Sequence, residues 1–105
     1  MLPQHLVIKR GGITVAQLTG CRPGGDMFWV ACRCYEQPGF EAVASIFRQI
    51  EAIPYLSQQQ FDKQFDALTK QISAMEIVLE NPLTGEQWPH FLLSFFDNNV
   101  VEIRY

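Results

Sequence analysis

Two short runs of strand-forming residues, 6–10 and 13–18, open the chain. Only Gly11 and Gly12 separate them, and a two-residue glycine loop readily adopts the positive φ angles of a tight β-hairpin. A second reversal at 22–26 precedes a third strand-like run at 27–35. The N-terminal third is therefore predicted to be a three-stranded antiparallel meander.

The apolar residues take on the spacing of helices in the middle of the chain. Between 40 and 52 they recur every three or four positions, and Pro54 ends this predicted helix. A second helix is predicted to begin at Ser57, whose hydroxyl can accept a hydrogen bond from the backbone N–H of Gln60. Leu56 and Phe61 are placed to pack together across this helix start. The expected inner stripe of the second helix consists of Phe61, Phe65, Leu68 and Ile72.

The last third returns to strand patterns at 75–80, 91–96 and 100–105, with turns at 81–85 and 97–99. The resulting order is βββ-αα-βββ. Helices gathered between two antiparallel blocks favour an α+β fold, in which both helices pack on one face of a sheet of about six strands. A chain of 105 residues supports one hydrophobic core, so residues 1–105 are expected to form a single α+β domain.

Two of the predicted strands are apolar on both faces. Residues 27–32 and 91–96 lack the alternation of apolar and polar positions that a strand with one wet face shows. We therefore expect these two strands in the middle of the sheet, and the alternating strands 75–80 and 100–105 nearer its edges. Apolar area would then remain on the second face, and a curled sheet, a homodimer or a partner protein could cover it. The residues expected to contribute to it are Phe28, Val30, Phe91 and Phe96.

Charge and apolar runs exclude several classes of partner. Eight basic and eleven acidic residues give a net charge of −3, which is the wrong sign for a general binder of nucleic acid or of anionic membranes. No apolar run approaches the roughly 18 residues of a transmembrane helix. The N-terminal residues lack the pattern of a secretory signal, and three cysteines fit free thiols in a reducing compartment. We expect a cytoplasmic protein that binds neither nucleic acid nor membrane.

The three cysteines predict neither a disulfide nor a metal site. Cys32 and Cys34 lie two residues apart in a predicted strand, which strains a bridge between them and does not match the spacing of a zinc knuckle. Pairing of Gly20 with residue 27 would place Cys32 opposite a residue near Val15. That position is several residues from Cys21, so a bridge to Cys21 is not expected. We interpret Cys32 and Cys34 as small buried hydrophobes and predict no metal and no cofactor.

The segment 86–91 carries the candidate chemistry of the chain. His90 follows Trp88 and Pro89, and Glu86 lies four residues before it, so a carboxylate could orient the imidazole for acid–base work. No nucleophile elbow or pair of catalytic carboxylates accompanies it, and Cys21 is a weak candidate nucleophile. We therefore predict no catalytic residues. The same segment suits a half-wet binding surface, because tryptophan and histidine combine an apolar body with a polar edge.

These features favour a small non-enzymatic protein that works by binding another protein. Acidic side chains are concentrated in the last third of the chain, and such a concentration can steer a basic partner. Within this class we expect a stoichiometric inhibitor, a toxin-immunity protein or an adaptor, with a toxin or an enzyme as the partner. The candidate partner-binding residues are Trp29, Glu86, Trp88, His90, Asp97 and Glu102.

Two other functions stay open on the sequence. The chain could be a structural homodimer in which sheets or helices of two copies pack together. It could also be a small enzyme or ligand-binding domain with a pocket near His90, between the sheet and the helices, that uses Glu86 and Cys21.

Overall fold

The computed structural model describes residues 2–26, 28–55 and 57–105, and in them seven strands and two helices. The strands form one antiparallel sheet in the order β5-β4-β1-β2-β3-β7-β6. The α+β prediction is confirmed, with one strand more than the six expected. The elements are β1 (His5–Arg10), β2 (Ile13–Pro23), β3 (Val30–Glu36), α1 (Phe40–Glu51), α2 (Gln58–Ala74), β4 (Ile77–Glu80), β5 (Gln87–Trp88), β6 (Leu92–Phe95) and β7 (Val100–Arg104).

The N-terminal meander forms as predicted. Gly11 and Gly12 take positive φ angles of 56° and 82° in the turn between β1 and β2, a conformation that glycine adopts without a steric penalty. β3 begins at Val30, later than the predicted start at Met27, which lies outside the described residues. Strands β1, β2 and β3 therefore form the middle of the sheet, next to one another.

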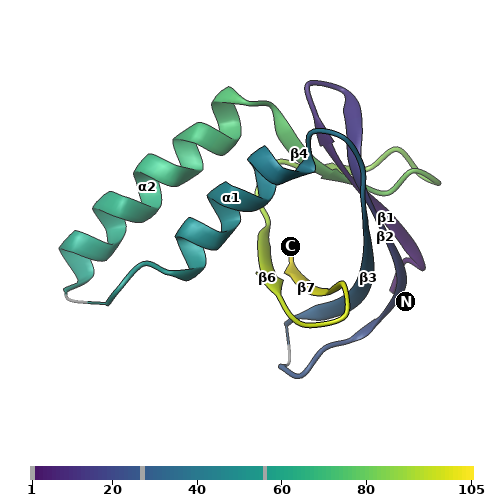
Figure 1. Ribbon diagram of the computed structural model, residues 1–105, viewed down its shortest axis with the longest axis horizontal. Helices are drawn as coiled ribbons and strands as arrows, with labels where there is room; N and C mark the ends of the chain where they lie inside the picture. The colour runs from purple at the N-terminus through teal and green to yellow at the C-terminus, as the bar shows by residue number, and fades with distance from the viewer. Residues whose placement is uncertain (1, 27, 56) are drawn as a thin grey trace.

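The sheet curls into a half-barrel whose inner face carries most of the core (Figure 1). Val30 and Phe91 are buried, whereas Phe28, which lies before β3, and Phe96, which follows β6, are exposed. The predicted second apolar face is thus divided: part of it is turned into the barrel by the curl, and part remains on the surface. The fully or almost fully buried inner residues of the sheet include Leu6, Ile8, Leu18, Cys32, Leu79 and Ile103.

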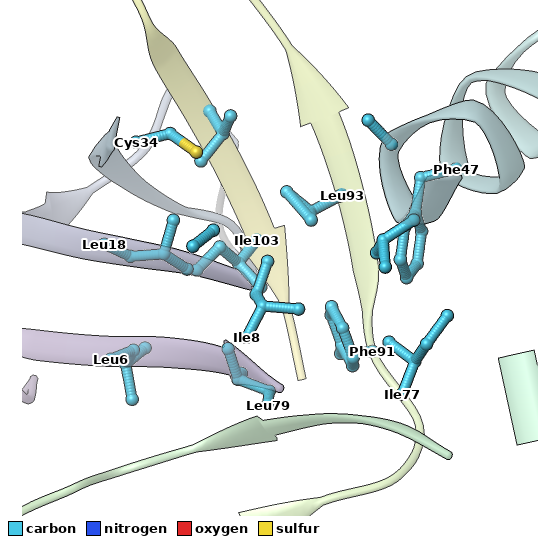
Figure 2. Close-up of a cluster of buried hydrophobic side chains, with 14 of the residues drawn as sticks. Leu6, Ile8, Leu18, Cys34, Phe47, Ile77, Leu79, Phe91, Leu93 and Ile103 are labelled. Carbon is cyan, nitrogen blue, oxygen red and sulfur yellow. The ribbon is translucent and has the colours of Figure 1, made fainter. Parts of the chain in front are cut away.

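Helix α1 packs on the inner face of the half-barrel and lies against β6. Its buried face includes Phe40 and Phe47, each 1% exposed. The ring of Phe47 lies 5.0 Å from that of Phe91, and the ring of Phe40 lies 6.5 Å from that of Phe95. Figure 2 shows Phe47 beside Phe91 in a cluster that other strands also enter. The aromatic contacts therefore join the helix to one end of the sheet.

The position of β6 corrects one expectation. The apolar strand was expected in the middle of the sheet, but β6 is an edge strand of the sheet. The strand is half-buried, with only Leu93 fully inside, because α1 packs against it. Phe95 lies under the guanidinium of Arg48, 4.6 Å from the ring centre, and the hydroxyl of Ser94 donates a hydrogen bond to Glu51. A covering helix is one way in which proteins protect a strand edge.

Helix α2 follows its predicted start but only part of its predicted stripe. The hydroxyl of Ser57 accepts a hydrogen bond from the backbone N–H of Gln60 at 3.2 Å, as expected for an N-cap. The proposed partner of Phe61, Leu56, lies outside the described residues. Leu68 and Ile72 are buried, whereas Phe61 and Phe65 are only half-buried. Figure 1 shows the reason, because the helical hairpin projects beyond the barrel at this end.

The short strand β5 was not predicted, and two polar contacts explain its position. Glu80 forms a salt bridge with Lys9 at 2.9 Å and accepts a hydrogen bond from the side chain of Gln87 at 2.8 Å. These contacts connect β1, β4 and β5 on the outer face. β5 ends before Pro89, which has no backbone N–H to continue the ladder.

Replacement of Phe47 by alanine should destabilise the protein strongly. The substitution empties a site between α1 and Phe91, so we expect a loss of about 3–5 kcal/mol in the free energy of unfolding. Urea denaturation followed by circular dichroism measures it. Gln49→Ala on the exposed side of the same helix is the matched control, with an expected change within about 0.5 kcal/mol. Equal effects of the two substitutions would contradict the packing of α1 in the barrel.

Candidate functional site

A pocket of about 420 Å³ lies where the curled sheet remains open. We call it the seam pocket. Helix α2 lines it with Phe65, Thr69 and Ile72, and the start of β4 lines it with Ile77 and Val78. The volume lies within the range of about 300–1,000 Å³ that is usual for ligand sites. The pocket therefore lies between the sheet and a helix, and His90 is among its lining residues.

The other side of the seam pocket is formed by the chain around β6 and β7. This side is lined by residues 89–92 and by Arg104 and Tyr105. β5 pairs only with Leu79 and Glu80, so the first half of β4 has no strand neighbour on this side in the part of the chain that the structure describes. After Pro89 the chain leaves β4 and reaches the opposite edge of the sheet. The opening is thus a consequence of the short β5.

One aromatic contact joins the two ends of the sheet beside the seam pocket. The rings of Trp88 in β5 and Tyr105 after β7 lie 4.7 Å apart with an angle of 54° between them. Burial raises the pKa of the Tyr105 hydroxyl, and the nearby groups Cys21, Cys32 and Glu86 raise it further. Tyr105 therefore lies between the seam pocket and the thiols of the core.

Arg104 gives the seam pocket its free positive charge. Its guanidinium lies 5.3 Å from the ring centre of Phe28, which is 65% exposed. Arg104 forms no salt bridge within residues 2–26, 28–55 and 57–105. Glu76 also lines the pocket, but its carboxylate lies 3.7 Å from the position that a Cβ on Gly11 would take, so it is turned toward the β1–β2 turn. The chemical character of the pocket is apolar with one available cation.

The structure brings together some of the predicted partner-binding residues. Trp88 and His90 lie at the seam pocket, and Glu86 lies close enough to affect the pKa of Tyr105. Trp29 directly precedes Val30, whose partner in β7 is Ile103, so it lies at the same end of the sheet.

Two other predicted residues lie elsewhere. Asp97 is in the turn between β6 and β7, at the opposite end of these strands. Glu102 lies on the outer face of β7, paired with Ala31 and Ser94 and in contact with the loop at Gly24. Asp97 and Glu102 are thus separate from Trp88, whereas Glu86 lies near it.

The predicted pairing of Glu86 with His90 is not seen. No side-chain hydrogen bond joins these two residues in the described chain. Sequence reasoning also missed Arg104 and Tyr105 as site residues. Both residues lie at the end of a strand with ordinary alternation of apolar and polar residues, so the sequence around them does not indicate a site. Only the curl of the sheet brings them close to β4 and α2.

The cysteines correct a second expectation. Cys21 and Cys32 are both buried, and their Sγ atoms lie 3.0 Å apart. A register shift between β2 and β3 is responsible: Thr19 pairs with Arg33 but Arg22 pairs with Ala31. Two residues of β2 thus oppose Cys32, and the simple register that separated it from Cys21 was wrong. Both cysteines are free thiols, as is Cys34.

The described residues contain no group of three or more histidine, cysteine, aspartate or glutamate side chains placed to hold a metal ion. Within the same residues, neither helix has the length and apolar character needed to cross a bilayer. Comparison with protein-family models, with curated proteins and with solved structures finds no match to this chain. The function therefore has to be argued from the seam pocket and its surroundings.

The titration of Tyr105 tests the contact with Trp88. The chain has three tyrosines, so a Tyr35→Phe/Tyr55→Phe variant retains Tyr105 alone. Because burial disfavours the phenolate, we expect its ultraviolet titration midpoint above the ordinary tyrosine value of about 10. Adding Trp88→Ala should lower the midpoint toward that value by exposing the ring. A midpoint at or below the ordinary value in the presence of Trp88 would contradict the contact.

Proposed function

We propose that this protein binds another protein, and that the seam pocket accepts a bulky apolar side chain of that partner beside a carboxylate group. The observation that carries the proposal is the pocket itself, with its apolar lining and the unpaired cation of Arg104 at its edge. Interfaces gain most of their affinity from such pockets, in which a large anchor side chain is removed from water.

Exposed aromatic surface next to the pocket supports a protein partner over a smaller ligand. Phe28 is 65% exposed and Tyr105 is 40% exposed, and both lie close to Arg104. Trp88 contributes a half-buried ring on the side of β5. A small molecule would fill the pocket without covering Phe28 or Trp88, whereas a protein would bury both the pocket and its surroundings.

The charge at the pocket supports a carboxylate next to the anchor. An arginine over an aromatic ring is held in place and keeps its hydrogen-bond donors available. Since the carboxylate of Glu76 is turned away, an incoming acidic group would meet Arg104 without a competing negative charge from this residue. The partner surface is therefore apolar at the centre and acidic at one side.

Three kinds of protein in this class fit the proposal: a stoichiometric inhibitor, a toxin-immunity protein and an adaptor. Each acts through a small domain that covers a site on a toxin, an enzyme or another protein. A cytoplasmic location is also part of the proposal, and three free cysteines support it, because reducing compartments keep thiols free.

The test uses N-acetyltryptophan as a probe for the anchor and its carboxylate, in a nuclear magnetic resonance titration of the labelled protein. We expect shifts at Ile72, His90 and Leu92. We also expect binding about 3-fold tighter than for the uncharged N-acetyltryptophanamide, because an exposed ion pair with Arg104 contributes up to about 1 kcal/mol. In Arg104→Gln the two probes should bind equally.

Two tryptophan substitutions on α2 provide the matched control. Thr69→Trp fills the seam pocket and should abolish the shifts, whereas Lys70→Trp adds the same side chain on the exposed face and should leave them unchanged. Proteins captured from a cell extract should be lost with Thr69→Trp and retained with Lys70→Trp. Equal behaviour of the two variants, with both folded, would exclude the seam pocket as the binding site.

The pocket volume favours a second candidate, a small-molecule binding domain with His90 at the site. A free amphipathic carboxylate would fit the same chemistry. The two candidates differ in the surface that they cover: a protein partner should shield the exposed ring of Phe28 from water, whereas a small ligand in the seam pocket should leave it exposed. A homodimer is the third outcome, and light scattering at micromolar concentration detects it.

A further inference from the structure

Cys21 and Cys32 form a pair of thiols that the binding function does not use. Their Sγ atoms lie 3.0 Å apart, closer than two sulfur atoms in ordinary van der Waals contact. Cys21 is 5% exposed and Cys32 is 1% exposed, so neighbouring side chains hold both in place. The pair joins adjacent strands, β2 and β3, across their shared ladder.

A β-bulge creates this pair. Gly20 has a positive φ of 62° and, with Cys21, opposes the single residue Cys32 of β3. A regular ladder would alternate the side chains of β2 and could not direct both Leu18 and Cys21 to the inner face. The extra residue at Gly20 shifts the alternation by one, so that Cys21 faces the core and meets Cys32.

We propose that Cys21 and Cys32 are a redox modification site, which a small peroxide converts into an intramolecular disulfide between β2 and β3. The sulfur atoms already face each other, so the bond requires a small side-chain rotation and no change in strand pairing. Hydrogen peroxide is the oxidant class that suits the site, because it is small enough to reach a buried thiol.

The reaction balances in two steps. The thiolate of Cys21 attacks one oxygen of the peroxide, the O–O bond breaks, and a sulfenic acid forms while the leaving hydroxide takes up a proton as water. The sulfur of Cys32 then attacks the sulfur of Cys21, the S–O bond breaks, and hydroxide leaves with the proton of Cys32 as a second water. Two thiols lose two electrons in total, and one peroxide is reduced to two waters.

The electrostatics of the pair assign the order of these steps. The S–H of Cys32 donates a hydrogen bond to the sulfur of Cys21, which lowers the pKa of Cys21 by stabilising its thiolate. The same hydrogen bond raises the pKa of Cys32 and keeps it protonated. Cys21 therefore reacts first with the oxidant, and Cys32 resolves the sulfenic acid.

Cys34 offers an internal comparison on the same strand face. It is buried like the other two, and burial raises its pKa to about 11. It follows Cys32 by two residues and pairs with Leu18, so no second cysteine lies opposite it in the ladder. Cys34 should therefore stay reduced when the pair is oxidised.

Tryptic digestion of the oxidised native protein separates the alternatives. Trypsin does not cleave between Arg22 and Pro23, so residues 11–33 remain one peptide that contains both Cys21 and Cys32, while Cys34 lies in residues 34–48. We expect peptide 11–33 to lose the mass of two hydrogens, about 2 Da, with no link to 34–48. Methionine oxidation adds oxygen and does not imitate this loss. Oxidation of glutathione in the same solution serves as the positive control, because it shows that the peroxide is active.

Variants and stability complete the test. Cys34→Ala should retain the loss of mass, and Cys21→Ala or Cys32→Ala should abolish it. The oxidised wild type should melt at least about 5 °C higher than the reduced protein, since the bridge closes a loop in the unfolded chain. A peptide 11–33 that keeps its hydrogens, gains only oxygen at Cys21 or is linked to 34–48 would overturn the proposal. All of these results come from the cysteines alone, so they are independent of binding at the seam pocket.

Discussion

The burial of one face of α1 inside the curled sheet is the interaction on which the rest of the structure depends. The edge strands of a half-barrel do not pair with each other, so its apolar inner face would be exposed to water if no helix packed on it. Phe40 and Phe47 fill this space, and their contacts with Phe95 and Phe91 hold β6 against the helix. A large aromatic side chain removes about 150–250 Å² from water, so two of them contribute a substantial part of the core. α1 packs against β6 and α2 against β4, and the two helices pack together, so the helical pair connects the two sides of the half-barrel.

The seam pocket follows from the limits of that cover. α1 packs against β6, whereas α2 reaches β4 only near its C-terminal half, with Leu68 and Ile72. β5 stops after two residues because Pro89 follows it, and the chain then passes to the opposite edge. The region between these elements is lined by apolar side chains that neither helix covers completely. The pocket therefore forms where the pairing of β4 and β5 has ended and the helices do not cover the sheet, and Arg104 adds a positive charge at its edge.

Local rules predicted much of the fold, and the parts that they missed depend on long-range geometry. The glycine pair at 11–12, the helical spacing at 40–52 and the cap at Ser57 each act within a few residues, so the sequence was sufficient for them. The bulge at Gly20 depends on how β2 matches β3, and its signal was a single glycine inside a strand. The place of β6 at the sheet edge, and the meeting of Trp88 with Tyr105, depend on the curl of the whole sheet. Trp88 and His90 were proposed from their residue types, whereas the place of Arg104 and Tyr105 at the seam pocket is visible only in the assembled sheet.

Tyr105 connects the two regions to which this structure assigns chemistry. Its ring packs on Trp88 beside the seam pocket, and its hydroxyl group is close enough to Cys21 and Cys32 for their charge to affect its pKa, after the larger effect of burial. A disulfide carries no charge and fixes β2 relative to β3. Oxidation of the pair would therefore remove the thiolate charges that raise the pKa of Tyr105. The bulge at Gly20 is the feature that brings Cys21 and Cys32 together, and Tyr105 lies between this proposed redox pair and the proposed binding site.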